Sequence, residues 1–253
     1  MIEPSVTHET PILEGKVLTK RFRTPASGTL RALDGASVEL FRGEILGVVG
    51  ESGCGKSTLA RLLCGLDRPD EGEVRFSGHP LTALRGEAFR TYRRSVQMVF
   101  QQPFASFDPR LTLGESAAEA LVNLGVPALE RERRIEDLFE RCGLSPELAR
   151  RYPSEVSGGQ CQRAALARAL APEPRVLVCD EMTSALDVIT QRRVLDLVRG
   201  IARERALAVL LITHDLALVR AYADRVLVMD AGRTVETRSE ERRVGKECRS
   251  RWS

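Results

Sequence analysis

The sequence predicts an α/β fold, with a mainly parallel β-sheet, helical crossovers and one helical insertion. From residue 158 to residue 229, short apolar runs alternate with segments of helical periodicity, an order that favours a parallel sheet with right-handed connections. The continuous apolar run at residues 45–49 is typical of a strand buried on both faces. Strand-like runs are missing from about residue 103 to residue 155, which indicates the insertion.

The elements follow in chain order. The first half is expected to hold strands at 16–18, 36–40, 45–49, 73–76 and 96–100, a loop at 24–28, and a helix over 57–66 after a glycine-rich turn. The insertion is expected to hold helices around 115–124 and 130–142, interrupted by prolines 127, 146 and 153. The second half is expected to hold helices to 170, over 188–204 and over 216–223, with strands at 176–179, 208–212 and 225–229 and a hairpin before the tail.

Composition indicates a globular protein without a membrane span. The chain has 253 residues, 43% hydrophobic and 29% charged, as in ordinary globular domains that bury a core. Its apolar run at residues 206–212 is far shorter than the ~20 residues that cross a bilayer. The acidic, polar N-terminus does not resemble a secretory signal. Six cysteines without a Cys-x-x-Cys pair favour single thiols in a reducing compartment over a zinc or redox site.

The last sixteen residues, 238–253, are expected not to be natural protein. They read RSEERRVGKECRSRWS, and their codons, when back-translated, fit a common sequencing adapter throughout. The tail holds six Lys or Arg and three Asp or Glu, and its charge of +3 equals that of the whole chain. Residues 1–237 therefore sum to zero, so the basic balance says nothing about partners. The alternative is a natural basic tail that binds lipid or nucleic acid.

A phosphate-binding loop follows the buried strand at 45–49. The pattern G-x-x-x-x-G-K-S spans residues 50–57, between the strand and a helix, which is the context that this motif needs. Its glycines let backbone N–H groups converge on phosphate oxygens at a helix N-terminus. Lys56 is expected to reach the β- and γ-phosphates, and Ser57 to ligate Mg²⁺. Cys54 is a weak candidate for a nucleophile, because no base is indicated to activate it.

Two carboxylates, Asp180 and Glu181, follow the apolar strand at 176–179. In a sheet of this kind that end of the strand lies beside the phosphate loop. Asp180 suits a water-mediated Mg²⁺ contact. Glu181 suits a general base that polarises the attacking water, a role worth ~10²–10⁴ in rate. The alternative is a strand that simply ends in solvated acids.

A second set of helix N-terminal N–H groups is expected at Ser157-Gly158-Gly159-Gln160. Such a set favours anions. One chain needs only one phosphate cradle per nucleotide, so the second predicts contact with a partner's nucleotide. The alternative is an ordinary serine helix cap.

With these motifs in order, the chain resembles the ATPases of ATP-binding-cassette (ABC) transporters over about residues 13–237. The resemblance implies a P-loop NTPase with a RecA-like core, an edge β-subdomain and a helical subdomain at about 103–155, all within residues 12–237. It implies catalytic roles for Glu181, His214 as the γ-phosphate switch, and Gln101. It implies Mg²⁺ contacts for Ser57, Gln101 and Asp180. The implied nucleotide contacts are Phe22 (with Phe41 as the alternative adenine-stacking residue), Gly50, Gly53, Gly55, Lys56, Ser57, Thr58, Ser157, Gly158, Gly159, Gln160 and Asp187, the last in a dimer-interface loop at 184–187.

A finer resemblance is to the peptide and nickel importer branch of this family. The stretches at residues 47–58, 96–110 and 151–163 are similar to it, above all the Ala-Ser-x-x-Pro-Arg type of element after Gln101. Two positions depart from the pattern. Met182 stands where proline is usual, which removes a residue that pre-sets φ beside Glu181, and Asp108 stands where asparagine is frequent.

The resemblance implies ATP and Mg²⁺ as cofactors and a second ABC ATPase subunit, identical or different, as a head-to-tail partner. It also implies integral-membrane permease subunits, an external solute-binding protein, no nucleic acid, and a peripheral location on the cytoplasmic face of the cell membrane. Oligopeptides or dipeptides are the expected cargo, with nickel or another small solute as the alternative.

Two other classes of function are kept as alternatives. A non-transport ABC ATPase acting on DNA or ribosomes usually carries long coiled-coil insertions or two cassettes, whereas this chain has one cassette and a short insertion. A regulatory nucleotide binder without hydrolysis is disfavoured by the intact Glu181.

Overall fold

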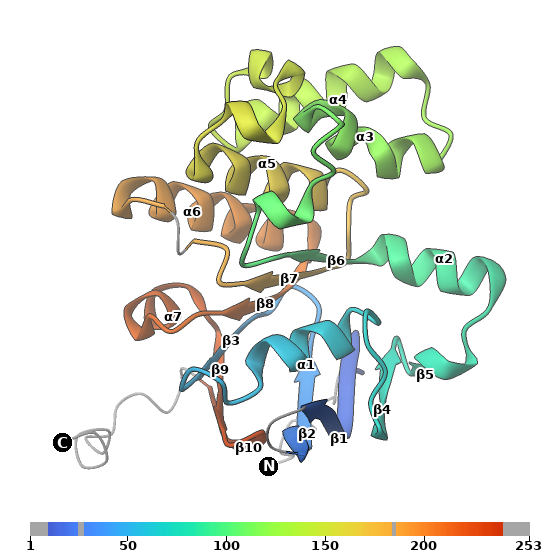
Figure 1. Cartoon of the computed structure of the whole chain (residues 1–253), viewed down its shortest axis with the longest axis vertical. Helices are drawn as coiled ribbons and strands as arrows, with labels where there is room; N and C mark the ends of the chain where they lie inside the picture. Colours follow the sequence, from blue (N-terminus) through green and yellow to red (C-terminus); the bar gives the residue numbers. More distant parts are fainter. Residues whose placement is uncertain (1–9, 25–27, 184–185, 240–253) are drawn as a thin grey trace, which may run out of the picture.

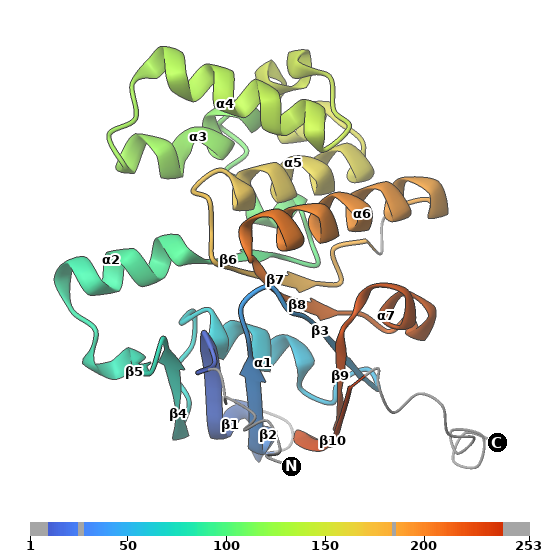
Figure 2. The same ribbon diagram turned by 180° about the vertical axis from the view of Figure 1, so that it is seen from behind.

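The computed structural model describes residues 10–24, 28–183 and 186–239. Three sequence-based expectations fall wholly or mainly outside this part: the N-terminal nine residues, Ser184 and Ala185 of the expected interface loop, and residues 240–253 of the expected adapter tail. The described chain forms one four-stranded and one six-stranded sheet. A helical segment lies on the side of the six-stranded sheet opposite the four-stranded sheet (Figures 1 and 2).

The six-stranded sheet is the core of the molecule and is mainly parallel, as expected. Its strands, in spatial order, are β10 (Arg233–Ser239), β9 (Arg225–Asp230), β3 (Ile45–Gly50), β8 (Ala208–Ile212), β7 (Val176–Asp180) and β6 (Val96–Val99). All neighbours pair in parallel except β9 and β10, which form the expected C-terminal hairpin. β10 continues to Ser239, past the boundary expected at Thr237.

Both faces of this sheet are buried, which explains the continuous apolar runs. Ile45, Leu177 and Leu211 point into a core shared with α5 (Gly158–Leu170), α6 (Val188–Arg205) and α7 (Leu216–Tyr222). The alternate residues of the same strands, such as Leu46, Val178 and Leu210, point into a second core shared with α1 (Lys56–Leu63) and the four-stranded sheet.

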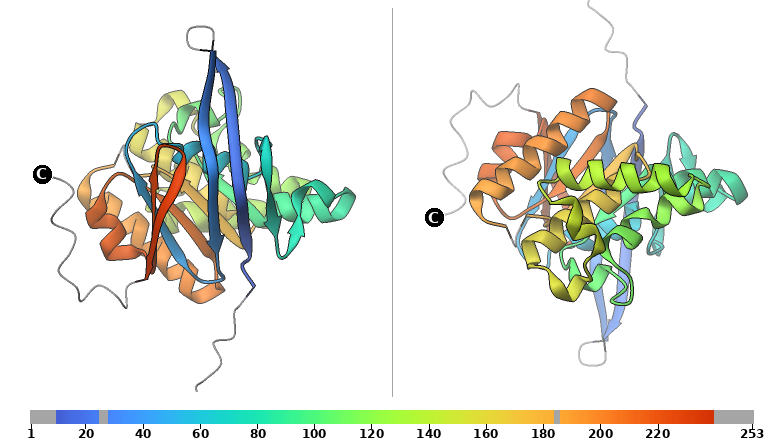
Figure 3. Two further views of the ribbon diagram at one scale, coloured as in Figure 1. Left: turned by 90° about the horizontal axis from the view of Figure 1, so that it is seen from below. Right: turned by 90° about the horizontal axis from the view of Figure 1, so that it is seen from above.

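The four-stranded sheet is antiparallel, with the order β2 (Gly28–Leu40), β1 (Leu13–Thr24), β4 (Glu71–Phe76) and β5 (His79–Pro80). Its β1–β2 hairpin forms a long arm (Figure 3) and is much longer than the short strands predicted. The register shifts around Leu18, and Val17 there is 62% exposed with φ 49°. This bulge breaks the polar–apolar alternation that is typical of a strand. The sequence pattern therefore predicted only a short part of β1.

One helix, α2 (Gly86–Ser95), was not predicted. Only Tyr92 and Ser95 of its residues are buried, and Ala88, Phe89 and Tyr92 are its only apolar residues, so its apolar face is short. Tyr92 is fully buried, and its hydroxyl donates a 2.6 Å hydrogen bond to the Leu63 carbonyl. This bond joins α2 to the end of α1, which finishes three residues before the predicted position.

The segment from 103 to 155 is helical, as expected, and none of its residues lies in a strand. It contains α3 (Leu113–Asn123), which begins with a Thr112–Glu115 capping box, and α4 (Ala128–Arg141), with short 3₁₀ turns around them. Leu121 and Phe139 belong to the core that also contains α5, so the segment is packed on that helix. No helix in the described part of the chain is both long and apolar enough to span a membrane.

Replacing Phe139 by alanine is expected to destabilise the protein by about 3–5 kcal/mol, because the side chain is fully buried between helices. Urea unfolding would measure it. Leu129→Ala on the same helix is the control: Leu129 is 64% exposed, so the expected change is within about 0.5 kcal/mol. Equal effects of the two substitutions would contradict this packing.

Candidate functional site

The candidate site lies where parallel strands end at one edge of the sheet. Val48 of β3 and Asp180 of β7 both stand opposite Ile212 of β8. Val99, near the end of β6, stands opposite Cys179. The segments that leave these strands therefore emerge side by side, as at the ligand-binding edge of α/β sheets.

The phosphate loop connects β3 to α1 and is shaped by glycine. Gly53 and Gly55 have φ of 82° and 104°, in the left-handed region that favours this residue. A Cβ on Gly55 would lie 2.4 Å from the Ala32 carbonyl oxygen, and one on Gly50 2.2 Å from the Met229 carbonyl oxygen. Both positions therefore exclude any side chain.

The loop presents a lysine and an uncapped helix N-terminus. Lys56 is buried, and its Nζ donates 2.8 Å hydrogen bonds to the carbonyl oxygens of Gly50 and Glu51. α1 begins at Lys56 without a side-chain cap, so the first-turn N–H groups, including those of Ser57 and Thr58, have no cap that competes with an anion.

Asp180 faces this loop from the end of β7. Its Oδ1 accepts a 3.2 Å hydrogen bond from the Ser57 hydroxyl, and the residue is only 4% exposed. Burial raises the pKa of Asp180, the hydrogen bond from Ser57 and the charge of Lys56 oppose this rise, and the charge of Glu181 adds to it. A buried carboxylate beside a hydroxyl at a phosphate loop is a fitting pair of oxygen donors for a hard cation.

Glu181 points to a different set of side chains. Its Oε2 accepts a 2.6 Å hydrogen bond from Gln101 Nε2, and its Oε1 lies 3.5 Å from His214 Nδ1. Glu181 has φ 48°, a left-handed conformation that costs about 1–2 kcal/mol for a residue with a Cβ. A backbone hydrogen bond of 3.0 Å from its N–H to the Ile212 carbonyl holds it. The structure thus brings together all three residues expected to be catalytic.

The second N–H set is present, but it belongs to another part of the chain. Ser157 caps α5 and forms a reciprocal capping box with Gln160, with bonds of 3.2 and 2.9 Å. Gly158 and Gly159 form the first turn of the helix. Among the described residues, no hydrogen bond or ion pair joins residues 157–160 to the phosphate loop, so this set does not complete the site of its own chain.

Asp187 acts as the N-cap of α6. Its carboxylate accepts hydrogen bonds of 3.0 and 3.1 Å from the N–H groups of Thr190 and Ile189, and the bond from Thr190 is the main cause of its lowered pKa. Thr183 Oγ1 accepts a 2.9 Å bond from Gln191 Nε2, an anchor of the same loop that the sequence analysis missed.

The two aromatic candidates lie at different places. Gly55 packs against Leu33 of β2, and this stretch pairs with Lys20, two residues before Phe22. Phe22 is 38% exposed. Phe41 precedes β3, whose six residues span about 20 Å from there to the phosphate loop, and Arg225 lies over its ring at 5.2 Å. Phe22 is therefore the aromatic residue on the phosphate-loop side.

The two departures from the family pattern have local explanations. Met182 is 1% exposed and belongs to the core beneath α5 and α6, so its side chain takes no part in the polar site. Asp108 receives hydrogen bonds from the Nε and Nη2 of Arg110, which lower its pKa to about 2.

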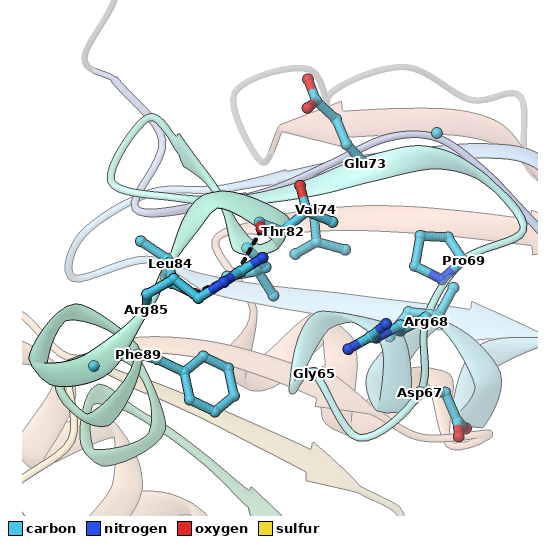
Figure 4. A pocket seen from close by; sticks show the side chains of 14 residues that line it. Gly65, Asp67, Arg68, Pro69, Glu73, Val74, Thr82, Leu84, Arg85 and Phe89 are labelled. Atoms are coloured by element: carbon cyan, nitrogen blue, oxygen red, sulfur yellow. Dashed lines mark hydrogen bonds between the residues drawn. The ribbon is translucent and has the colours of Figure 1, made fainter.

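A separate pocket of about 520 Å³ lies away from this site, among the end of α1, β4 and α2 (Figure 4). Leu62, Val74 and Phe89 are among its apolar lining residues, and Arg68 and Arg85 also line it. Neither arginine forms a salt bridge among the described residues. Arg85 donates only to the carbonyl oxygens of Thr82 and Leu84.

The donors fit a nucleotide phosphate with one Mg²⁺. No group of three or more His, Cys, Asp or Glu side chains in the described chain is arranged to hold a metal ion by itself. Mg²⁺ usually takes one or two protein oxygens and completes its shell with water and phosphate. Ser57 and Asp180 supply that number.

Asp180→Asn is expected to raise the thermal midpoint of the protein in EDTA at pH 7. A raised pKa means that ionising Asp180 costs more in the folded than in the unfolded state. The penalty sets in as the pH rises above the ordinary value of 3.8 and is complete above the folded-state pKa. The gain should therefore shrink towards pH 4, and about 1 kcal/mol would appear as about 2–4 °C. Asp137→Asn, an exposed acid on α4, is the control. An unchanged or lower midpoint for Asp180→Asn would contradict the burial argument.

Comparison with known proteins agrees with this geometry. A family model described as "ABC transporter" matches residues 33–184. The oligopeptide transport ATP-binding protein OppF of Salmonella typhimurium is 47% identical over 211 residues, which is 82% of this chain and 63% of that protein. The di/tripeptide transport ATP-binding protein DppF of Pseudomonas aeruginosa is 47% identical over 208 residues, with 82% and 64% covered. The chain thus spans somewhat less than two thirds of these relatives.

A solved structure is also similar. The ATP-binding cassette MJ0796, in a dimeric post-hydrolysis state bound to ADP and Pi, superposes with a TM-score of 0.81 at 29% identity and covers 90% of this chain and 98% of its own. Together with the motifs gathered at the sheet edge, these matches establish that the chain belongs to the ABC transporter family, in its ATP-binding cassette.

Proposed function

We propose that this chain binds and hydrolyses ATP and thereby drives the import of peptides across a membrane. The position of Glu181 is the main observation in favour of hydrolysis. Its carboxylate lies between Gln101 Nε2, at 2.6 Å, and His214 Nδ1, at 3.5 Å. It adjoins Asp180, which is hydrogen-bonded to Ser57. A carboxylate next to the expected γ-phosphate position is placed to accept a proton from water.

The site residues have separate proposed roles. Lys56 and the N–H groups of residues 50–58 bind the phosphates, Ser57, Asp180 and Gln101 hold Mg²⁺, and Phe22 stacks on the adenine. When bound, Mg²⁺ neutralises charge on the β- and γ-phosphates. Glu181 orients the water and takes its proton, while Gln101 and His214 fix the Glu181 carboxylate. We assign these roles to one cassette over residues 12–237, with a helical subdomain at about 103–155.

The separation of residues 157–160 from the phosphate loop supports a head-to-tail dimer. In this arrangement the α5 N-terminus of one subunit faces the nucleotide of the other, and each site is completed in trans. The dimeric state of the MJ0796 cassette supports this arrangement. Asp187, which caps α6, lies in the loop that would cross the interface.

Peptides are the proposed cargo because the relatives at 43–47% identity include oligopeptide and di/tripeptide transport proteins. Nickel or another small solute is the alternative. The proposed partners are a second ATPase subunit and integral-membrane permease subunits that receive cargo from an external solute-binding protein. The chain would then act on the cytoplasmic face of the cell membrane.

The membrane subunits are proposed to contact the helical subdomain and the pocket of Figure 4. In Figures 1 and 2, α2 and the turn between α3 and α4 project on the same side of the molecule. α2 leads through the four-residue strand β6 almost directly to Gln101. The apolar lining and the two arginines, which form no salt bridge among the described residues, favour a partner helix with apolar and acidic side chains.

Glu181→Gln is expected to retain ATP binding and to slow turnover by ~10²–10⁴, because glutamine keeps the shape of the side chain but does not accept the proton. Phosphate release and nucleotide binding would be measured in parallel. Glu173→Gln, at an exposed surface ion pair, is the matched control. Turnover at the wild-type rate in the Glu181 variant would refute the proposed base.

Phe89→Asp is expected to reduce co-purification with the proposed permease subunits by about tenfold, since it places a charge among the apolar residues that line the pocket. Val235→Asp, on an exposed β10 side chain, should leave co-purification unchanged. The same complex in vesicles should take up labelled peptide with ATP. Export of the peptide, or equal loss in both variants, would contradict the proposed partner surface or direction.

A further inference from the structure

Arg168 of α5 reaches out of its own helix to the segment that follows Gln101. Its Nη1 donates a 2.5 Å hydrogen bond to the Ser106 carbonyl, and its Nη2 donates a 3.0 Å bond to the Ser106 hydroxyl. Its guanidinium carbon also lies 4.4 Å from the centroid of the Phe107 ring. One side chain therefore holds two consecutive residues by three interactions.

Gln162 of the same helix holds the other end of this segment. Its Nε2 lies 3.4 Å from the Phe100 carbonyl, the residue directly before Gln101. The side chain is 2% exposed, and its Oε1 has no hydrogen-bond partner among the described residues. Gln162 and Arg168 lie about 9 Å apart along the helix, so residues 100–107 run beside α5 and are fastened at both ends.

Packing alone does not explain an arginine at position 168. Among the described residues Arg168 forms no salt bridge, and burial lowers its pKa although the charge of Glu119 opposes this shift. A partly buried charge without an ion partner costs free energy that an apolar side chain would not. What the guanidinium adds is its planar fork, which fixes the direction of the two bonds to Ser106.

The two elements that Arg168 joins, the segment after Gln101 and helix α5, both contain residues with proposed roles in ATP hydrolysis. Gln101 begins the fastened segment and donates to the base Glu181 at 2.6 Å. The N-terminus of α5 carries Ser157 and the N–H groups proposed to face the second nucleotide. A shift of Gln101 is therefore passed to α5 through side chains and not only through the backbone.

We infer that Arg168 is a positioning residue that holds the segment after Gln101 against α5, so that Gln101 and the α5 N-terminus move as one unit. The inference rests on the roles proposed above for Gln101 and Glu181. Arg168 itself lies outside the reacting atoms and acts through Gln101.

The test is a double-mutant cycle between Arg168→Met and Gln101→Ala in the full chain, read as ATP turnover. Arg168→Met alone should lower kcat about tenfold, the rate equivalent of one hydrogen bond to a charged group, with KM for ATP unchanged because the phosphate loop is untouched. In the Gln101→Ala background the same substitution should change kcat by less than about twofold. Arg163→Met is the matched control, since Arg163 lies on α5 but donates to Cys142, Gly143 and Gly159 and not to the segment after Gln101, and its effect should be the same in both backgrounds.

A tenfold loss that persists in the Gln101→Ala background, or Gln101→Ala alone with wild-type kcat, would overturn the inference. Amide hydrogen exchange gives a readout that does not depend on catalysis. Arg168→Met should raise exchange at residues 101–107 and leave residues 142–144 unchanged, whereas Arg163→Met should do the opposite. If Arg168→Met does not fold, Ser106→Ala removes the hydroxyl acceptor of the same contact and takes its place. Wild-type turnover in Glu181→Gln would refute the proposed base without altering the exchange result.

Discussion

The architecture depends on the close approach of three backbone segments around the phosphate loop. Gly50 lies against the Met229 carbonyl and Gly55 against the Ala32 carbonyl, with no space for a Cβ at either place. Gly232, in the turn between β9 and β10, donates a 3.0 Å hydrogen bond to the Cys54 carbonyl. The loop is thus held between the four-stranded sheet and the C-terminal hairpin. This confinement fixes the start of α1, and the positions of Lys56 and Ser57 depend on it.

The same edge gives two consecutive carboxylates different environments. Asp180 ends a fully buried strand and turns to Ser57, whereas Glu181 adopts a left-handed backbone conformation and turns to Gln101 and His214. In a continuing strand successive side chains simply point to opposite faces of the sheet. The left-handed residue instead ends the strand and directs the second carboxylate along the sheet edge. Adjacent residues thereby obtain the two environments that the proposed roles, metal binding for Asp180 and proton acceptance for Glu181, require.

Sequence reasoning succeeded where one local pattern decides the structure. The parallel strands were predicted from continuous apolar runs such as residues 45–49, which arise because both faces of the sheet are buried. The phosphate loop was predicted because its glycines occur at fixed spacing. It failed where tertiary contacts decide. α2 has only two buried residues, and the bulge at Val17 hides the length of β1. Gln101 and Glu181 were each predicted, but a contact across 80 residues leaves no trace in a local pattern. The reach of Arg168 to Ser106 is of the same kind.

Three residues in or near the site adopt states that are unfavourable for the stability of the fold. Glu181 has a strained backbone, the pKa of Asp180 is raised by burial, and Gln162 Oε1 is buried without a partner. Each is a state that a protein selected for stability alone would relieve. A cation bound beside Asp180 would offset the cost of its buried charge. Gln162 is hydrogen-bonded to Phe100. A small shift of the segment after Phe100 would therefore change the surroundings of Gln162 Oε1, which has no hydrogen-bond partner among the described residues. Strain that a ligand relieves is a source of differential affinity between two conformations. The contacts from Glu181 to Gln101, and from the segment after Gln101 to α5, are therefore the route by which we expect nucleotide binding to move the helical segment.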